Sequence, residues 1–198
     1  KVCKDSIYYE FAKKLGLYLS NKTVIVLRNY KHLTKIIELL VNYDVDLFYF
    51  TAPSLRGQAR IESSDFFISL NKMKPYVVKA IKKMKSIWKE DENGIFHPNI
   101  LIECVPYCFL QGVEDRILPE PFKRDMYKPK ICVDCIYYDV CPGVFKDYIK
   151  MFGEDEFSPI KVKNLSKKEI KGRSYKLIKS FYGPENKSKL LNQTGYSY

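Results

Sequence analysis

The most informative stretch of this sequence runs from Ile131 to Pro159 and reads ICVDCIYYDVCPGVFKDYIKMFGEDEFSP. It holds Cys132, Cys135 and Cys141 in a C-x2-C-x5-C pattern, which is half of the six cysteines in the chain. Cysteines this close in sequence can direct their thiolates to one metal centre, because the C-x2-C turn places both sulfurs on the same side. The stretch therefore predicts a site for a soft metal and supplies three of its ligands.

A fourth thiolate would complete either a tetrahedral zinc site or a [4Fe-4S] cluster, and the spacing alone does not separate the two. Cys108 is the nearest upstream candidate, Cys104 is the reserve ligand, and Cys3 is too remote in sequence to be favoured. Pro142 directly follows Cys141, as a proline follows the last cysteine of many iron-sulfur sequences. Apolar residues also interleave the ligands. These features favour the cluster, with zinc or free buried cysteines as the alternatives.

A helix is expected directly after the last cysteine, in residues 142–153 (PGVFKDYIKMFG). Pro142 suits its first turn and Gly153 the position past its end. The partly positive N-terminus of such a helix would face the thiolates and favour a negatively charged cluster. The acidic residues 154–156 that follow predict a charged exit loop, with a carboxylate site as the alternative.

Upstream of the cysteines, the spacing of apolar residues alternates between the helical and the strand pattern. We expect helices in residues 6–16, 31–44 and 74–90, the last one opened by Pro75, and buried strands in residues 23–27, 46–51 and 99–106. A strand, a helix and a strand in succession are typical of a parallel βαβ unit. The sequence therefore predicts an α/β fold.

The cysteine-rich stretch also resembles a known family. The order of Pro106-x-Cys108, the cysteine triplet, Tyr148 and the closing GEDEFSPI is similar to the C-terminal auxiliary-cluster region (SPASM or twitch) of radical S-adenosylmethionine (radical SAM) enzymes. The resemblance continues upstream through residues 23–59 and covers most of residues 20–160. It implies an auxiliary [4Fe-4S] cluster whose ligands are Cys108, Cys132, Cys135 and Cys141.

The same resemblance implies that the loop after residues 46–51 approaches S-adenosylmethionine, with Gly57 and Ala59 near the nucleotide. An ordinary β-to-α loop is the alternative. The family binds its catalytic cluster through a C-x3-C-x2-C motif early in the barrel, and this sequence contains no such motif. We therefore expect the C-terminal half of a partial (β/α) barrel followed by a small cysteine-rich iron-sulfur domain, inactive without the missing N-terminal half. A peptide or protein substrate is a further expected partner.

Three regions are predicted: a partial barrel in residues 1–103, an auxiliary-cluster domain in residues 104–160, and a basic tail in residues 161–198. After Ile160 there are ten Lys or Arg side chains against two glutamates, so the tail supplies a net +8 of the +11 charge of the 198-residue chain. Such a tail could contact nucleic acid or an acidic partner. A solvated end is the favoured interpretation.

Composition bounds the class of protein. With 46% hydrophobic and 15% aromatic residues, the chain has ample material for a core. There is no run of eighteen apolar residues and no signal-like start, so we expect a cytoplasmic protein without a membrane span. Six cysteines in a reducing compartment favour metal binding over disulfides. The alternative function is a non-catalytic zinc or iron-sulfur module whose basic tail binds nucleic acid or a partner protein.

Overall fold

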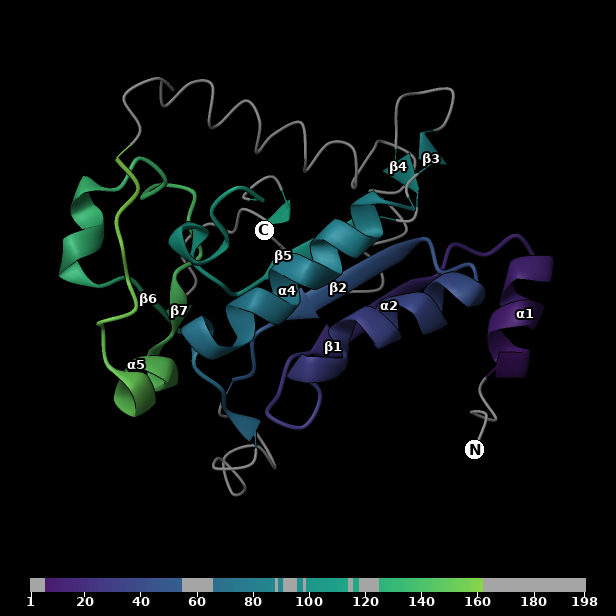
Figure 1. Cartoon of the computed structure of the whole chain (residues 1–198), viewed down its shortest axis with the longest axis horizontal. Helices are drawn as coiled ribbons and strands as arrows, with labels where there is room; N and C mark the ends of the chain where they lie inside the picture. Colours follow the sequence, from purple (N-terminus) through teal and green to yellow (C-terminus); the bar gives the residue numbers. More distant parts are fainter. Residues whose placement is uncertain are drawn as a thin grey trace.

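A three-stranded parallel sheet lies at the centre of the computed structural model, which describes residues 6–54, 66–87, 89–90, 96–97, 99–113, 116–117 and 125–161. Its strands are β1 (Ser20–Val24), β2 (Leu47–Thr51) and β5 (Asn99–Glu103), in the order β1-β2-β5. Helices α2 (Leu33–Asn42) and α4 (Leu70–Lys85) cover one face of the sheet (Figure 1). The α/β fold and the βαβ unit are confirmed. The described strands form an open sheet and close no barrel.

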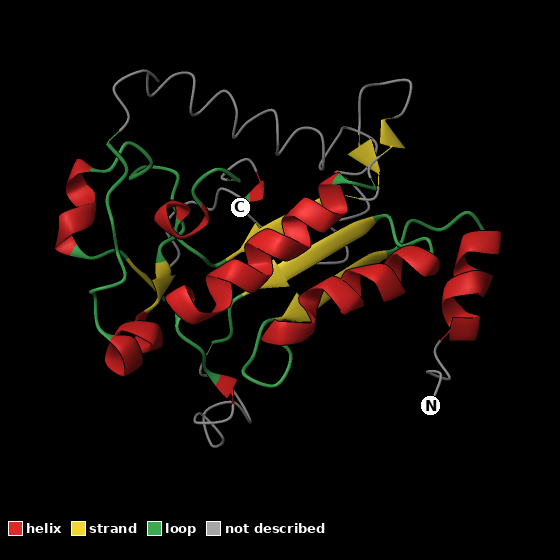
Figure 2. Ribbon diagram, in the orientation of Figure 1, coloured by secondary structure: helices red, strands yellow, loops and turns green. Residues whose placement is uncertain are grey.

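The remaining elements are short and lie around the sheet and the two helices that cover it (Figure 2). They are α1 (Ser6–Lys14), η1 (Tyr30–His32), β3 (Lys89–Glu90), β4 (Phe96–His97), η3 (Tyr107–Leu110), β6 (Met126–Tyr127), η5 (Lys130–Asp134), β7 (Val144–Phe145) and α5 (Lys146–Phe152), where η denotes a 3₁₀ helix. β3 pairs with β4 and β6 pairs with β7, both antiparallel. None of the described helices is long and apolar enough to cross a bilayer.

One hydrophobic core joins the sheet to the cysteine-rich region. Phe48 and Phe50 of β2 are in register with Ile100 and Ile102 of β5, and all four are fully buried against α2 and α4. Burying a side chain of this size contributes about 1.5–3 kcal/mol. The same cluster continues through Cys141, Val144, Tyr148 and Phe157. The two regions therefore pack together, and the boundary placed before residue 104 stays a prediction.

Near the N-terminus, the first predicted helix is confirmed as α1. Gly16 has a φ of 68°, and the N–H groups of Gly16 and Leu17 bond to the carbonyls of Lys13 and Ala12 at 2.9 and 3.0 Å. This is a Schellman motif, in which a left-handed glycine ends the helix. The first strand lies at residues 20–24 rather than 23–27. Among the described strands it lies at the edge of the sheet, and alternate residues are exposed, so the prediction of a buried strand is wrong here.

The predicted start of the third helix is also wrong, because α4 begins at Leu70 and contains Pro75 in its interior. Ser69 is the N-cap, and its hydroxyl accepts a bond from the N–H of Lys72 at 3.4 Å. Leu70 and Met73 are buried in the core, which stabilises the turn before the proline. Tertiary packing thus extends the helix past the boundary that Pro75 indicates.

The helix after the last cysteine starts later than predicted. Residues 144–145 form β7, and α5 begins only at Lys146, so its N-terminus does not adjoin Cys141 and the expected effect of its dipole on the thiolates is wrong. Gly143, at a φ of 72°, turns the chain into β7. The predicted end at Gly153 is confirmed, since this residue is the C-cap with a φ of 70°.

A carboxylate from the acidic loop caps α4. The N–H groups of Leu70 and Asn71 donate to the two Oε atoms of Glu156 at 3.1 and 3.0 Å, and the Leu70 N–H also donates to the Tyr148 hydroxyl at 2.7 Å. The Tyr148 hydroxyl in turn donates to Glu156. A carboxylate at this position satisfies free N–H groups and interacts favourably with the helix dipole. Glu156 is therefore part of the fold rather than of an exit loop.

We expect Glu156→Ala to lower the free energy of unfolding by about 1–2 kcal/mol, as the loss of a helix cap does. Urea denaturation followed by circular dichroism measures the change. The matched control is Glu154→Ala, two residues away, which removes only an exposed bond from the Tyr127 hydroxyl. That control should shift stability by less than about 0.5 kcal/mol. Equal effects of the two substitutions would show that the bonds from Glu156 to the N-terminus of α4 add nothing to the free energy of unfolding.

Candidate metal centre

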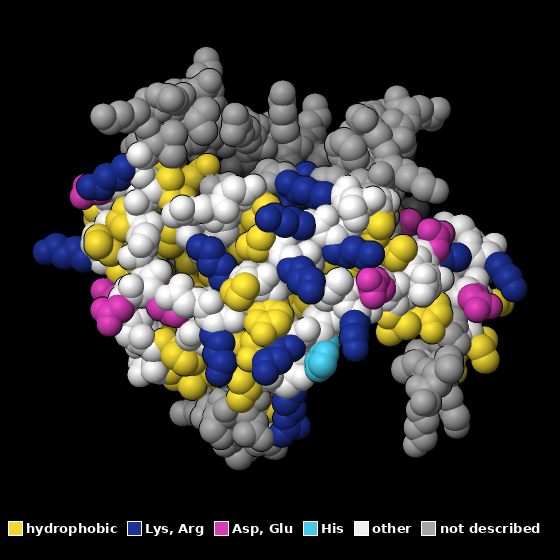
Figure 3. Space-filling view, in the orientation of Figure 1, with side chains coloured by type: hydrophobic (Ala, Val, Ile, Leu, Met, Phe, Trp, Pro, Cys, Tyr) yellow, Lys and Arg dark blue, Asp and Glu magenta, His cyan; other side chains and the backbone are white. Residues whose placement is uncertain are grey.

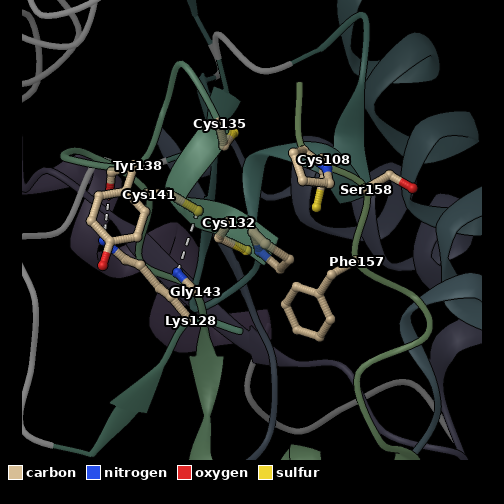
Figure 4. A pocket seen from close by; sticks show the side chains of 11 residues that line it. Cys108, Lys128, Cys132, Cys135, Tyr138, Cys141, Gly143, Phe157 and Ser158 are labelled. Atoms are coloured by element: carbon tan, nitrogen blue, oxygen red, sulfur yellow. Dashed lines mark hydrogen bonds between the residues drawn. The ribbon is translucent and has the colours of Figure 1, made fainter. Parts of the chain in front are cut away.

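The four cysteines predicted as ligands line one cavity (Figure 4). The volume of this cavity is about 20 Å³. The full lining is Pro106, Cys108, Lys128, Cys132, Cys135, Tyr138, Cys141, Gly143, Phe157, Ser158 and Pro159. All four cysteines are free thiols and at least half-buried. The fold thus brings Cys108, some twenty residues upstream, to the triplet.

Cys108 reaches the cavity because the chain turns directly after the central sheet. β5 ends at Glu103, and the short helix η3 carries Cys108 between buried Tyr107 and Phe109. The ring of Tyr107 stacks on that of Tyr137, with centroids 4.4 Å apart and planes 11° apart. This stacking holds the loop of the triplet against η3.

Successive tight turns place the triplet itself. The N–H of Cys132 bonds to Pro129 O at 2.9 Å, that of Cys135 to Cys132 O at 2.9 Å, and that of Cys141 to Tyr137 O at 2.8 Å. The C-x2-C pair thus spans the end of η5, with both residues in one turn. The Ile136 N–H bonds to Ile160 O at 3.1 Å, which closes the loop against the last described segment.

Backbone N–H groups point at three of the four sulfurs. Gly143 N donates to Cys141 Sγ and Ile160 N to Cys135 Sγ, each at 3.4 Å. The N–H groups of Ser158 and Tyr107 bond to the sulfurs of Cys108 and Cys141. N–H donors of this kind stabilise negative charge on sulfur and tune iron-sulfur centres.

Burial and mutual repulsion both affect the pKa values of the cysteine thiols. Burial raises the pKa of Cys132 to about 12, with repulsion from Cys108, Cys141 and Cys135 adding to the shift. Burial likewise raises the pKa of Cys141 to about 11 and that of Cys108 in the same direction. Without a cation the thiols of Cys108, Cys132 and Cys141 therefore keep their protons at neutral pH. Metal binding must displace these protons, and a bound cation would relieve the repulsion between thiolates.

Lys128 is a lining residue that the sequence analysis did not identify. Its Nζ donates to Tyr138 O at 2.5 Å and lies 4.9 Å from the centroid of the Tyr138 ring. The ammonium group lowers the pKa of Cys132 and Cys141, although burial outweighs it. It is the cationic side chain among the residues that line the cavity. Only its position four residues before Cys132 could have drawn attention to it.

The sulfurs do not form a finished metal site. Within the described ranges, no group of three or more His, Cys, Asp or Glu side chains is arranged to hold a metal ion. A four-thiolate centre would therefore require the side chains to close in. The chemistry of the donor set still fits a thiolate-bound metal, since four thiols and four backbone N–H contacts to sulfur surround one cavity.

The other predicted site residues lie elsewhere. Cys104 is buried with a φ of 58° and does not line the cavity. Gly57, Ala59, Cys3 and the tail after residue 161 lie outside the described residues, so the predicted nucleotide loop and nucleic-acid contacts stay predictions.

A polar group on the sheet was also missed by the sequence analysis. Lys22 of β1 forms an ion pair with Glu103 of β5, whose side chain is only 11% exposed, and Lys22 Nζ lies 5.8 Å from the centroid of the Tyr49 ring. These residues share the face opposite the one covered by α2 and α4, as the register and the alternation of side chains require. Glu103 lies at the carboxyl end of β5, the end at which α/β sheets place their ligand sites.

No protein-family model, curated protein or solved structure matches this chain. The case for the site therefore depends on its own residues.

Gly143 offers a test of how rigidly the cavity is built. A Cβ at this position would lie 2.3 Å from Tyr127 O, and the φ of 72° is left-handed. We expect Gly143→Ala to cost about 1–2 kcal/mol for the backbone alone, plus the cost of moving the β6-β7 pair. Guanidinium denaturation measures the loss.

Gly112→Ala is the control for this substitution. Gly112 also has a positive φ, 87°, but a Cβ there meets nothing within 4 Å. It should therefore incur the backbone cost alone. If both variants lose the same stability, the close approach of Gly143 to Tyr127 is not a constraint on the site.

Proposed function

We propose that this chain is the C-terminal portion of a radical SAM enzyme and that Cys108, Cys132, Cys135 and Cys141 hold an auxiliary [4Fe-4S] cluster. The observation that carries the proposal is the convergence of these four thiols on one cavity, with backbone N–H groups directed at three of them. Cys104 lies outside this lining, which supports its place as the reserve ligand.

The lining of the cavity favours a cluster over zinc. Pro106, Phe157 and Pro159 supply apolar walls. Such walls limit the access of water and oxygen, which a cluster needs more than zinc does.

Each part of the site has a defined task in this proposal. The cluster, when bound, supplies electron transfer or substrate coordination. The thiolates of the four cysteines ligate it, and the N–H groups of Gly143, Ile160 and Ser158 stabilise their charge. Lys128 adds a positive charge beside Cys132.

The central sheet supports the remaining part of the proposal, a partial (β/α) barrel. Three parallel strands in sequential order, with α2 and α4 on one face, match consecutive units of such a barrel. The opposite face would then line the barrel interior, where Lys22 in the middle of β1 pairs with Glu103 at the carboxyl end of β5. The loop after β2, with Gly57 and Ala59, would approach S-adenosylmethionine in the complete enzyme. The missing N-terminal half is the proposed partner, in a reducing cytoplasm.

The first test is cluster loading. Anaerobic reconstitution with iron and sulfide should give about four irons per chain and broad absorption in the visible range. Serine in place of Cys132, Cys135, Cys141 or Cys108 should abolish or strongly reduce the iron content. Cys104→Ser is the matched control, since it replaces a buried cysteine outside the cavity, and it should load normally.

Two results would contradict this assignment. Stoichiometric zinc in anaerobically purified protein, with no uptake of iron, would favour the non-catalytic metal module. A requirement for Cys104 with Cys108 dispensable would show that the fourth ligand is wrongly assigned.

The second test asks whether the chain alone cleaves S-adenosylmethionine. Cleavage needs a cluster with one iron free to bind the substrate, and four thiolates leave no iron free. We therefore expect no 5′-deoxyadenosine above the cluster-free control when reconstituted protein is incubated with dithionite and S-adenosylmethionine and the products are separated by chromatography. Turnover would mean that one of the four cysteines is not a ligand.

A further inference from the structure

Helix α1 presents an apolar stripe to solvent. Ile7, Tyr8, Phe11 and Leu15 are between 59% and 72% exposed, and Leu17, just past the helix, is 53% exposed. Figure 3 shows hydrophobic side chains at the surface around α1, at the right of the view, close to both acidic and basic ones. Exposed apolar stripes of this kind mark surfaces that bind another protein or a membrane.

The opposite side of α1 is fixed to the rest of the protein. Tyr9 stacks on Tyr43 with ring centroids 5.4 Å apart, and Lys13 Nζ forms ion pairs with Asp44 and Asp46 at 3.2 and 2.9 Å. At 100° per residue, Tyr9 and Lys13 lie on the side of the helix away from the stripe. The helix therefore cannot turn its stripe onto the core without losing these contacts.

Two opposite charges flank the stripe on one side. Glu10 and Lys14 are both exposed, four residues apart, and neither forms an ion pair with the residues that the structure describes. In an antiparallel pair of identical helices related by a two-fold axis, each flank faces the same flank of the other copy. A crossing near residue 12 would then place Glu10 of each copy opposite Lys14 of the other. The same crossing would pair Ile7 with Leu17.

We propose that α1 is a homodimer contact, in which the stripe of Ile7, Tyr8, Phe11 and Leu15 packs antiparallel against the same stripe of a second copy and Glu10 pairs with Lys14 across the two-fold axis. The surface is self-complementary in charge, and its apolar stripe faces its own counterpart, as a two-fold interface requires. The proposal concerns the end of the sheet away from the cysteines and does not depend on the function of the metal centre.

A lipid surface is a poorer match for this helix. Helices that lie on membranes carry Lys and Arg along the polar flanks of a long apolar face. α1 has nine residues, and Glu10 beside the stripe would be repelled by anionic headgroups.

Sedimentation equilibrium of the full chain over a range of concentrations is the test. We expect a reversible dimer, and Phe11→Glu should raise its dissociation constant by at least tenfold, because it places a charge at the centre of the stripe. Met151→Glu is the matched control. Met151 is an exposed residue of α5, at the far end of the molecule from α1 (Figure 1), and its replacement should leave the dimer unchanged.

Charge reversal tests the antiparallel pairing. Glu10→Lys or Lys14→Glu alone should weaken the dimer by roughly tenfold, since like charges then face each other. The double variant Glu10→Lys/Lys14→Glu should restore it. Circular dichroism of each variant checks that α1 and the fold are retained.

Three results would overturn the proposal. They are a wild-type chain that stays monomeric, a dimer that Phe11→Glu does not weaken, and a double reversal that fails to rescue. Co-sedimentation with phosphatidylserine vesicles that Phe11→Glu abolishes, without any dimer, would instead assign the stripe to membranes. A monomer that binds no lipid would indicate that the partner of the stripe is another polypeptide. None of these outcomes affects cluster loading, which is measured independently.

Discussion

The capping of α4 by Glu156 is the interaction on which the arrangement of the site depends. α4 is packed into the central core, so its N-terminus is a fixed point, and the carboxylate of Glu156 binds the N–H groups of Leu70 and Asn71 there. The residues that follow run directly along the cavity. Phe157 forms part of its wall, and the N–H groups of Ser158 and Ile160 bond to the sulfurs of Cys108 and Cys135. One cap thus connects the rigid layer to the sulfur donors.

The parts of this fold that the sequence predicts are those in which the local pattern and the tertiary packing agree. β2 is a continuous apolar run because it is the central strand, and α2 has a clear apolar face because it covers one side of the sheet. Errors occur where distant contacts decide a boundary. Pro75 indicates a helix start, but the cap from Glu156, some eighty residues away, together with the burial of Leu70, moves it upstream.

The same limit applies to the candidate site. The triplet was visible because its spacing is local, and Cys108 was the nearest upstream candidate. Lys128 and the N–H donors were not visible, because backbone N–H groups carry no sequence signal and a single lysine among 34 Lys and Arg residues does not stand out. The position of Gly143 was missed for a related reason. Position 143 requires glycine because a Cβ there would clash with the carbonyl of Tyr127 on the paired strand. The sequence does not reveal this pairing, because strands of two residues leave no periodic pattern.

The order of helices and strands in the chain explains why α2 and α4 bury their apolar faces on the sheet while α1 exposes its apolar stripe. Each parallel strand is preceded in the chain by a helix, and α2 and α4 each bury their apolar faces against the pair of strands that they connect. α1 precedes β1, whose one neighbour among the described strands is β2, so the described part of the chain places no strand pair beneath α1. Its apolar stripe therefore faces outward, while Tyr9 and Lys13 on its other side attach it to the loop before β2. Among the described residues, the unpaired edge of β1 and the exposed stripe of α1 thus have one cause, and covering the stripe would bury apolar surface without changing the core that holds the cysteines.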